Sequence, residues 1–471
     1  MKKTFLMTAA LALAAVGSAS AATITVNSTG DEFTANGQCT LREAIGNANS
    51  GNAFPDCANG DDDDGVVDRI VFAPSVTGTI LISKHVSYKI LTPVSIEGPG
   101  AGVLTIDADD FSRIFKIDGG TPGIEVTISG LKLIRGNTGL ETDGKDGGAI
   151  WVVRSDDQLF LRDSVLSDNQ ATNGGALQNQ GSAEVDRCTF TENESGQFGA
   201  AISNLGFLGM LHSAIVHNES VVTGGGVFNF GSLAVFNTTI AANTAALNGG
   251  GLSLEGNSNV RLDNVTIALN TADGDGEGNG DGGGIFTGLA NAGAQVSLSN
   301  SILSGNRDGS AGHEGPDCFG GHLKTIGHNI IGDTKNCFFE GDAGPGDLFD
   351  TDPKLGPLAD NGGPSLTLLP LAGSPAIDGG NDPAGCFSDD QRGFERPVDA
   401  DGDGIARCDI GAVEVAAATT PSGGTTGGTT GGDSGVGGDD GGEGTTGGEN
   451  AAGNSSEEEG APASGGCSLI R

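Results

Sequence analysis

The sequence predicts an all-β fold: a right-handed parallel β-helix (solenoid) with N- and C-terminal caps and a disordered C-terminal tail. The first observation behind this prediction is an asparagine that recurs about every 25 residues, a period typical of solenoids. This asparagine column consists of Asn169, Asn193, Asn218, Asn243, Asn270 and Asn306. Because one short coil cannot bury its own apolar face, we expect successive coils to stack on one another.

Two apolar columns provide the second observation. The column eight residues before each asparagine reads Leu161, Val185, Met210, Val235, Leu262 and Leu298. The column three residues before it reads Leu166, Phe190, Ile215, Ile240, Ile267 and Leu303. As a third observation, a glycine turn follows the asparagine and leads into Leu177, Ile202, Val227, Leu252 and Ile285. We therefore expect about three short strands per coil, with these columns facing the core.

Leucine-rich repeats have a similar period, and a further column argues against them. They need an apolar residue five before the asparagine, where this chain has Ser164, Cys188, Ser213, Thr238, Val265 and Ser301. The second half of each repeat is rich in glycine and β-branched residues, which are poor helix formers. We predict that the asparagines form an internal ladder, with each amide bonded to the next coil at a turn where asparagine adopts left-handed backbone. The right hand is expected from the usual crossover preference.

Taken in order, the chain begins with residues 1–21, which read as a secretory signal peptide. Lys2 and Lys3 precede an apolar run, and Ala19-Ser20-Ala21 precedes the expected cleavage at Ala22. No later segment approaches the roughly 20 apolar residues that span a bilayer. We expect a protein that is secreted or held at the outer cell surface, with no direct bilayer-spanning segment.

Composition excludes some partners. The net charge is −38 with only 23 basic residues, so electrostatic binding to nucleic acid or anionic lipid is not expected. Eight cysteines in an exported chain predict disulfides. Their spacing predicts the pairs Cys39 with Cys57, Cys318 with Cys337, and Cys386 with Cys408. Cys188 is predicted to be a buried free thiol, and Cys467 stands alone in the tail with no predicted role.

Residues 22–68 are predicted to form the N-terminal cap. The heptapeptide Cys39-Thr40-Leu41-Arg42-Glu43-Ala44-Ile45 resembles the CSLREA motif of secreted bacterial β-helix proteins, with Thr40 in place of serine. From the residues themselves, we expect a short amphipathic helix over 41–48. A cap is needed because an open first coil exposes unpaired strand edges.

Residues 69–340 are predicted to form the β-helix. Phe190-Thr191-Glu192-Asn193 and Gly147-Gly148-Ala149-Ile150 resemble the FxxN and GGAI repeats of polymorphic outer-membrane proteins. The chain lacks the membrane barrel with which that family ends. The resemblance therefore implies coil geometry and no particular export route.

Residues 341–415 are predicted to form the C-terminal cap. Five motifs resemble the choice-of-anchor Q domain, which in that family closes bacterial surface β-helices and precedes an anchoring tail. They begin at Asp352, Asp360, Gly373, Asp390 and Cys408. Residues 416–471 are rich in Gly, Thr and acidic residues, and are predicted to be a disordered tether. Envelope anchoring through this tail, or release of the protein, follows as an expectation.

Catalytic chemistry has weak support in the sequence. Glycosidases need two carboxylates on one groove, and the candidate pairs are Asp109-Asp110 and Asp156-Asp157. Adjacent strand residues point to opposite faces, so we interpret both pairs as solvated acids. Charges at similar coil positions are interpreted as ion pairs between coils: Arg162, Asp163, Asp186, Arg187, Arg261 and Asp263. No catalytic residue and no zinc site are predicted.

Calcium is the one cofactor that the sequence suggests. The loop from Asp399 to Gly404 places oxygen ligands at alternate positions around a glycine turn, as calcium loops require. The predicted ligands are Asp399, Asp401, Asp403, Ile405 through its carbonyl, and Asp409. An ordinary acidic turn is the alternative.

These observations favour a non-enzymatic β-helix protein that acts in adhesion or surface display. We expect it to bind a glycan or a surface protein along one coil face. The insertions 138–147 and 271–284 precede the glycine turn and indicate the side on which that face lies. The alternatives are a polysaccharide lyase or glycoside hydrolase, and a passive matrix element without a ligand.

Overall fold

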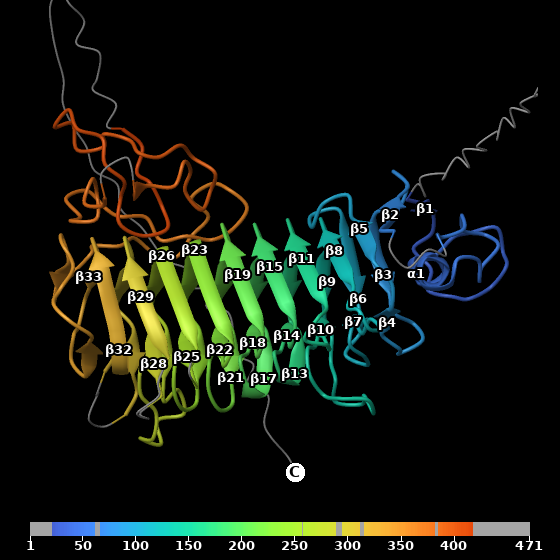
Figure 1. The fold of residues 1–471 in the computed structure, drawn as a ribbon, viewed down its shortest axis with the longest axis horizontal. Coiled ribbons are helices and arrows are strands. Elements are labelled where there is room, and N and C mark those ends of the chain that lie inside the picture. The colour runs from blue at the N-terminus through green and yellow to red at the C-terminus, as the bar shows by residue number, and fades with distance from the viewer. Residues whose placement is uncertain are drawn as a thin grey trace, which may run out of the picture. The chain divides into compact units, whose positions relative to one another are not determined.

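The computed structural model describes residues 21–61, 66–256, 258–288, 294–310, 315–381 and 385–417. The residues before Ala21, the tail beyond Ala417 and Cys467 lie outside these ranges. Apart from one helix, the regular elements of the described chain are all strands, and every strand ladder is parallel, which confirms the predicted β-helix. Figure 1 shows the coils side by side in chain order, from β1 and β2 at one end to β32 and β33 at the other.

The strands form four stacks, each with one strand per coil. The first stack contains β1 (Thr23–Val26), β2 (Asp68–Phe72), β5 (Val94–Glu97), β8 (Glu125–Ser129), β11 (Gln158–Arg162), β15 (Ser182–Asp186), β19 (Phe207–Leu211), β23 (Ser232–Ala241), β26 (Asn259–Ala268), β29 (Gln295–Ser299) and β32 (Cys318–Gly327). The second stack contains β3 (Gly78–Leu81), β6 (Leu104–Asp107), β9 (Lys132–Ile134), β12 (Val165–Ser167), β16 (Thr189–Thr191), β20 (Ala214–Val216), β30 (Ile302–Ser304), β33 (Ile330–Ile331) and β35 (Leu348–Phe349), with the later halves of β23 and β26 between β20 and β30.

The third and fourth stacks complete the coils. The third contains β4 (Tyr88–Ile90), β7 (Phe115–Ile117), β10 (Ile150–Val152), β14 (Leu177–Asn179), β18 (Ile202–Asn204), β22 (Val227–Asn229), β25 (Leu252–Leu254), β28 (Ile285–Thr287), the start of β32, and β34 (Cys337–Phe339). The fourth contains β13 (Gln170–Asn173), β17 (Glu194–Phe198), β21 (Glu219–Ser220), β24 (Thr244–Ala245), β27 (Thr271–Ala272) and β31 (Arg307–Asp308).

The core lies inside the coils, where the three predicted apolar columns stack in register. Leu161 pairs with Val185, and Leu166 pairs with Phe190, in the next coil. Leu177 pairs with Ile202 in the same way. The members of all three columns are at most 1% exposed. The hydrophobic effect therefore acts between neighbouring coils, and it sets the register of every strand pair.

One helix, α1 (Leu41–Ser50), lies against β1, β2 and β4 at the N-terminal end. Its first turn is closed by a capping box: the Glu43 amide donates to the Thr40 hydroxyl, and the Thr40 amide donates to the Glu43 carboxylate. Thr40 keeps the hydroxyl that a serine would offer at this position, so the departure from the CSLREA pattern preserves the cap.

The C-terminal cap was predicted over residues 341–415, but β35 in this range still pairs with β33 of the second stack. Residues 352–415 pack along the side of the coils, over the second stack. Leu368 packs against Ala214, Val216, Ala241 and Ala268, which are the small outward side chains of three successive coils. Figure 1 shows this segment, in orange to red, above the coils that contain β23, β26 and β33. We call residues 352–415 the flank segment.

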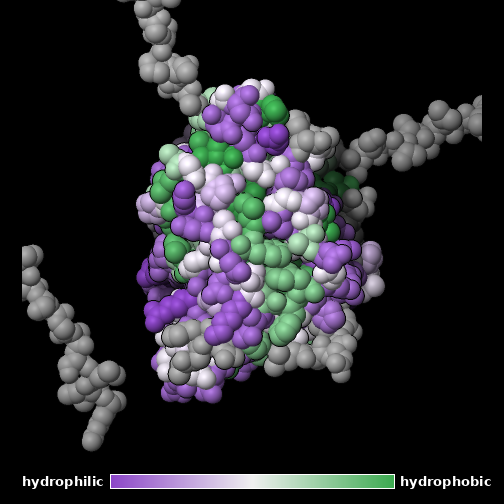
Figure 2. Space-filling view, turned by 90° about the vertical axis from the view of Figure 1, so that its left-hand side faces the viewer, coloured by the Kyte–Doolittle hydropathy of each residue, from purple (hydrophilic) through white to green (hydrophobic). Residues whose placement is uncertain are grey.

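The end of the stack that contains β32 and β33 has a different surface. Figure 2 faces this end and shows a strip of hydrophobic surface between hydrophilic areas. Ile326 and Phe338 are the half-exposed large apolar side chains of this region, at 49% and 60% exposure. Among the described residues, the helical cover is confined to the opposite end, where α1 lies.

Candidate functional site

The structure brings the six predicted ladder asparagines into one hydrogen-bonded column. Nδ2 of Asn169 donates to Oδ1 of Asn193 at 2.9 Å, and the same contact repeats at 2.9 Å up to Asn306. Asn306 then donates to Oδ1 of Asp317, which ends the column. The asparagines are almost fully buried. The column is therefore a structural element of the core and offers no surface for a ligand.

The backbone of the ladder differs from the prediction. We expected the asparagines themselves to adopt the left-handed conformation, and this was wrong. The left-handed residue is the one directly before each asparagine, as in Asp168, Glu192, His217 and Ala242. Each of these side chains points away from the core, while the asparagine that follows has ordinary backbone and aims its amide inward.

The coils contain a second asparagine ladder that the sequence analysis did not predict. Asn179 Nδ2 donates to Asn204 Oδ1 at 2.8 Å, and Asn204 Nδ2 donates to Asn229 Oδ1 at 2.6 Å. The ladder stops where Leu254 takes the equivalent place in the next coil. The signal was present in the sequence as an asparagine two residues after the third apolar column.

The predicted cysteine pairs are present as disulfides: Cys39–Cys57, Cys318–Cys337 and Cys386–Cys408. Cys188 is a buried free thiol. Burial raises the pKa of Cys188 to about 12, so it stays protonated and unreactive in the folded protein. Three disulfides are typical of a protein from an oxidising compartment.

The candidate catalytic acids have separate structural contacts. The buried carboxylate of Asp157 accepts hydrogen bonds from the amides of Gly119 and Ile124. Burial raises the pKa of Asp157. Asp156 is paired with Arg154, and Asp109 with Arg135.

The coil charges are also paired. Arg187 contacts Asp163 at 2.7 Å in the preceding coil, and it also contacts Asp186. Arg261 contacts Asp263 at 3.0 Å. Arg187 therefore holds Asp163 and Asp186 as an ion-paired group, as expected for charges between coils. Arg162 is in none of the ion pairs among the described residues, and its guanidinium carbon lies 5.7 Å from the ring centre of Phe160.

The predicted calcium ligands are only partly brought together. Asp399 and Asp401 meet Asp378, with one carboxylate oxygen from each within 4.8 Å of the others. Asp403 and Asp409 are not members of this group. The buried Asp409 carboxylate accepts from the amides of Asp378 and Val415 instead, and burial raises the pKa of Asp409 to about 7.

The Asp378 carboxylate is also held by backbone donors. Its Oδ2 accepts hydrogen bonds from the amides of Ala400 and Asp401, each at 2.9 Å. Three hard oxygen donors at this spacing suit calcium, which takes six to eight oxygen ligands. The sequence did not indicate Asp378, because it lies about twenty residues before the loop and in a different motif.

The outer face of the first stack contains an open hollow of about 320 Å³. Its floor consists of the small side chains Ser232 and Ala234 of β23. On one side, the half-exposed ring of Phe207 lies over Gly209. On the other side lie side chains of the next two coils, Asn259, Arg261, Gln295 and Ser297. We call this site the coil-face hollow.

The hollow exists because of the strand register. One row of paired positions runs across four coils and contains Phe207, Ser232, Asn259 and Gln295. The small Ser232 side chain therefore leaves a space between the Phe207 ring and the amides of Asn259 and Gln295. A second row contains Ala234, then Arg261, Ser297 and Lys324. The Arg261 side chain is 64% exposed, and its guanidinium carbon lies 5.2 Å from the ring centre of Phe236.

The two insertions are on another side of the coils. Residues 138–147 contact the fourth stack, where the Thr172 amide of β13 donates to the Lys145 carbonyl at 2.7 Å. In the second insertion, the Gly274 amide donates to the carbonyl of Ala245, in β24. Figure 1 shows loops of the matching colours projecting from the lower edge of the coils, below β10 and β28. The insertions therefore share a side, and it is not the face that carries the hollow.

Comparison with known proteins gives no match: neither a family model, nor a curated protein, nor a solved structure is similar to this chain. In the part of the chain that the structure describes, no helix is long and apolar enough to cross a membrane. Function must therefore be inferred from the surface itself.

Proposed function

We propose that this chain is a secreted or surface-displayed bacterial protein that acts in adhesion by binding an acidic glycan in the coil-face hollow. The observation that carries the proposal is the arrangement of Phe207, Asn259 and Gln295 around a floor of small side chains. The apolar face of a sugar ring packs on an aromatic ring, and its hydroxyls exchange hydrogen bonds with amides. The proposal therefore moves the ligand from the insertion side, where we expected it, to the face of the first stack.

The preference for an acidic glycan follows from the cations of the second row. Arg261 and Lys324 lie on the same face as the hollow, in a protein whose net charge is −38. A guanidinium and an ammonium group donate charge-assisted hydrogen bonds to carboxylates. The long strand face also suits a polymer, because equivalent positions recur at each coil.

A glycan array with the full chain tests this proposal. Phe207→Ala is expected to weaken binding of the best glycan by about tenfold, because it removes the stacking surface. Phe338→Ala is the control, since Phe338 is also a substantially exposed phenylalanine, at 60% against 42% for Phe207, but lies in β34, away from the hollow. Equal binding by wild type and Phe207→Ala would reject the site.

The polysaccharide lyase or hydrolase remains the alternative function. Product analysis of each bound glycan separates the two: binding without new reducing or unsaturated ends supports adhesion, and cleavage supports the enzyme. Tethering to the envelope through residues 416–471 belongs to the same proposal. It is tested by whether a chain truncated after residue 417 leaves the cell surface for the medium.

A calcium ion held by Asp378, Asp399 and Asp401 is a second proposal, supported by the approach of these three carboxylates. Calcium would bring the flank-segment loop and Asp378 together and relieve the repulsion among their charges. We expect calcium to raise the melting temperature of wild type relative to chelator, and Asp399→Asn to abolish most of this rise. Asp403→Asn, in the same loop but outside the group, is the control. An unchanged melting temperature after chelation would contradict the proposal.

A further inference from the structure

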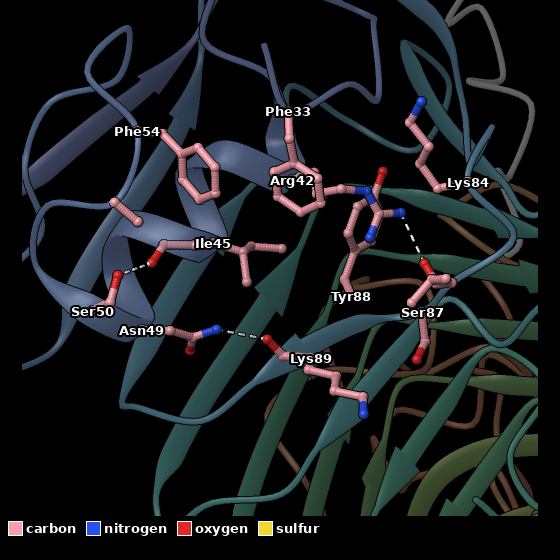
Figure 3. Close-up of a pocket in the computed structure, with 13 residues that line it drawn as sticks. Phe33, Arg42, Ile45, Asn49, Ser50, Phe54, Lys84, Ser87, Tyr88 and Lys89 are labelled. Atoms are coloured by element: carbon pink, nitrogen blue, oxygen red, sulfur yellow. Dashed lines mark hydrogen bonds between the residues drawn. The ribbon is translucent and has the colours of Figure 1, made fainter. Parts of the chain in front are cut away.

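The N-terminal end of the protein contains a cavity of about 410 Å³ that is separate from the coil-face hollow. It lies between helix α1, the loop that follows α1, and the segment that leads into β4 (Figure 3). We call it the N-terminal pocket. Its volume is in the range in which proteins bind single small molecules, roughly 300–1,000 Å³.

The walls of the pocket are largely apolar. Figure 3 shows Phe33 and Phe54 at one side, with Ile45 of α1 projecting between them and Tyr88. The Phe33 and Phe54 rings stack with their centres 5.0 Å apart. Phe33 is 51% exposed and Val86 is 52% exposed. The fold thus leaves apolar surface uncovered here, although α1 lies directly beside it.

A buried polar group makes one wall rigid. Arg42 of α1 donates to the carboxylate of Asp31 at 2.7 Å and to the carbonyl of Val86 at 2.8 Å. The Tyr88 hydroxyl donates to the same carboxylate at 3.0 Å. The Arg42 guanidinium lies 4.4 Å from the centre of the Tyr88 ring. These contacts hold the pocket open in one shape, because every buried polar group in the wall is satisfied.

The charge of the pocket is opposite to that of the protein. Three basic residues line it, Arg42, Lys84 and Lys89, and none of its lining residues is acidic. Asp31 neutralises Arg42, and Lys89 is only loosely paired, with its Nζ 3.8 Å from Asp143. None of the ion pairs among the described residues includes Lys84. In a chain with 61 acidic and 23 basic residues, an apolar cavity with three basic and no acidic lining residues differs from the average surface.

We propose that the N-terminal pocket binds a small amphipathic anion, an apolar chain or ring that carries one carboxylate. The apolar part would cover Phe33, Ile45 and Val86, and the carboxylate would lie at the rim near Lys84, which extends from the opposite side of Tyr88 to Lys89 (Figure 3). Burial of the apolar part supplies the affinity, and the positive charge of the rim, with Lys84 nearest the carboxylate, supplies the selection for an anion. The surrounding negative field of the protein disfavours polyanions, so a single charge fits best.

Titration calorimetry of the full chain with decanoate tests the proposal, with decyltrimethylammonium as a ligand of the same chain length and opposite charge. We expect one decanoate per chain and much weaker binding of the cation. Displacement of the fluorescent probe 8-anilinonaphthalene-1-sulfonate by decanoate gives a second readout.

Two variants assign the binding to this pocket. Lys84→Glu/Lys89→Glu is expected to weaken decanoate binding by about tenfold or more. Lys132→Glu/Lys335→Glu makes the same change in net charge outside the pocket and outside the coil-face hollow, and should leave the affinity as it is. Val86→Ser, at an exposed position, should weaken binding several-fold without unfolding the cap, which circular dichroism checks.

Three results would overturn the proposal. The first is equal affinity for the anion and the cation, which would indicate general hydrophobic adsorption. The second is an equal loss of affinity in the two lysine double variants. The third is binding of a glutamate-rich peptide without binding of decanoate, which would make the pocket a protein-docking site. None of these results depends on glycan binding at the coil-face hollow.

Discussion

Each ladder asparagine uses its whole amide group, as Asn218 illustrates. Its Nδ2 donates to Oδ1 of Asn243 and to the Phe190 carbonyl, while its Oδ1 accepts from the Nδ2 and the backbone amide of Asn193. No water is needed to satisfy any of these groups. A buried amide costs free energy when it is unpaired, so the ladder is stable only as a complete column.

Asn218→Ala is expected to lower the free energy of unfolding by about 3 kcal/mol or more, because it leaves buried donors of Asn193 without partners. Urea unfolding followed by circular dichroism measures the change. Asn52→Ala is the control, since Asn52 is exposed and outside the ladder. Similar losses in the two variants would show that the ladder adds no specific stability.

His212 links the coils to the flank segment. Its Nδ1 lies 3.0 Å from Asp186, and its Nε2 lies 3.6 Å from Asp389 of the flank segment. The hydrogen bond with Asp186 raises the pKa of His212, and the charge of Asp389 raises it further, whereas burial and nearby Arg187 lower it. Protonated His212 therefore stabilises the folded state.

The sign of the pH effect follows from the raised pKa. The contribution of His212 is fully present below its unfolded pKa of about 6.5, and it is lost as pH rises through the higher folded pKa. We expect the stability difference between wild type and His212→Gln to shrink as the pH rises above about 6.5. His217→Gln, at an exposed position in the same coil, should show no such trend. A difference that grows with pH would contradict this assignment.

At the scale of elements, the flank segment docks through its motif residues. Thr239 of β23 donates to the Gln391 side chain at 2.6 Å, and the Ala412 amide donates to Thr266 of β26 at 3.0 Å. The Gly411 amide donates to the Asn300 carbonyl at 2.8 Å. Two motifs of the resemblance to the choice-of-anchor Q domain therefore lie at the contact with the coils.

Gly411 is the most constrained position of this contact. Its φ is +101°, and a Cβ there would lie 2.8 Å from Thr266 Oγ1 and 2.9 Å from Ile302 Cδ1. We expect Gly411→Ala to cost about 2–4 kcal/mol, from backbone strain and overpacking together. Limited proteolysis should then cleave the flank segment sooner than in wild type.

Gly393→Ala separates the two causes. Gly393 also has a left-handed φ, of +83°, but no atom lies within 4 Å of its Cβ position. Its replacement should cost about 1 kcal/mol, from backbone strain alone. If both variants lose the same stability, close packing of the flank segment on the coils is not what Gly411 provides.

At the scale of the whole molecule, the two proposed sites lie on a protein that is strongly negative overall. Both sites contain cations that face outward: Lys84 and Lys89 at the N-terminal pocket, and Arg261 and Lys324 near the coil-face hollow. Long-range repulsion disfavours densely charged polyanions such as nucleic acid, while the individual cations at each site attract a sparsely charged ligand at short range.

The repeat made most of the fold predictable. The period near 25 residues, together with the apolar and asparagine columns, predicts which residues face inward in every coil. This works because each coil packs on a neighbouring coil that has the same sequence pattern. Cysteine spacing predicted the three disulfides because the two cysteines of each pair are close in the sequence and close a local loop. The error on left-handed backbone at the asparagines arose because the turn residue and the ladder residue are neighbours, and the pattern alone did not tell them apart.

The sequence by itself determined the coils, because periodic residues report contacts with equivalent residues one period away. Only the tertiary structure decided where the flank segment lies, how Asp378 joins Asp399 and Asp401, and where the two hollows open. These features depend on contacts such as Asn264 with Gly411, 147 residues apart, at 3.2 Å. Each contact of this kind occurs only once in the chain, so no repeated sequence pattern reveals it. Such contacts stabilise the protein only after distant segments have been brought together by folding.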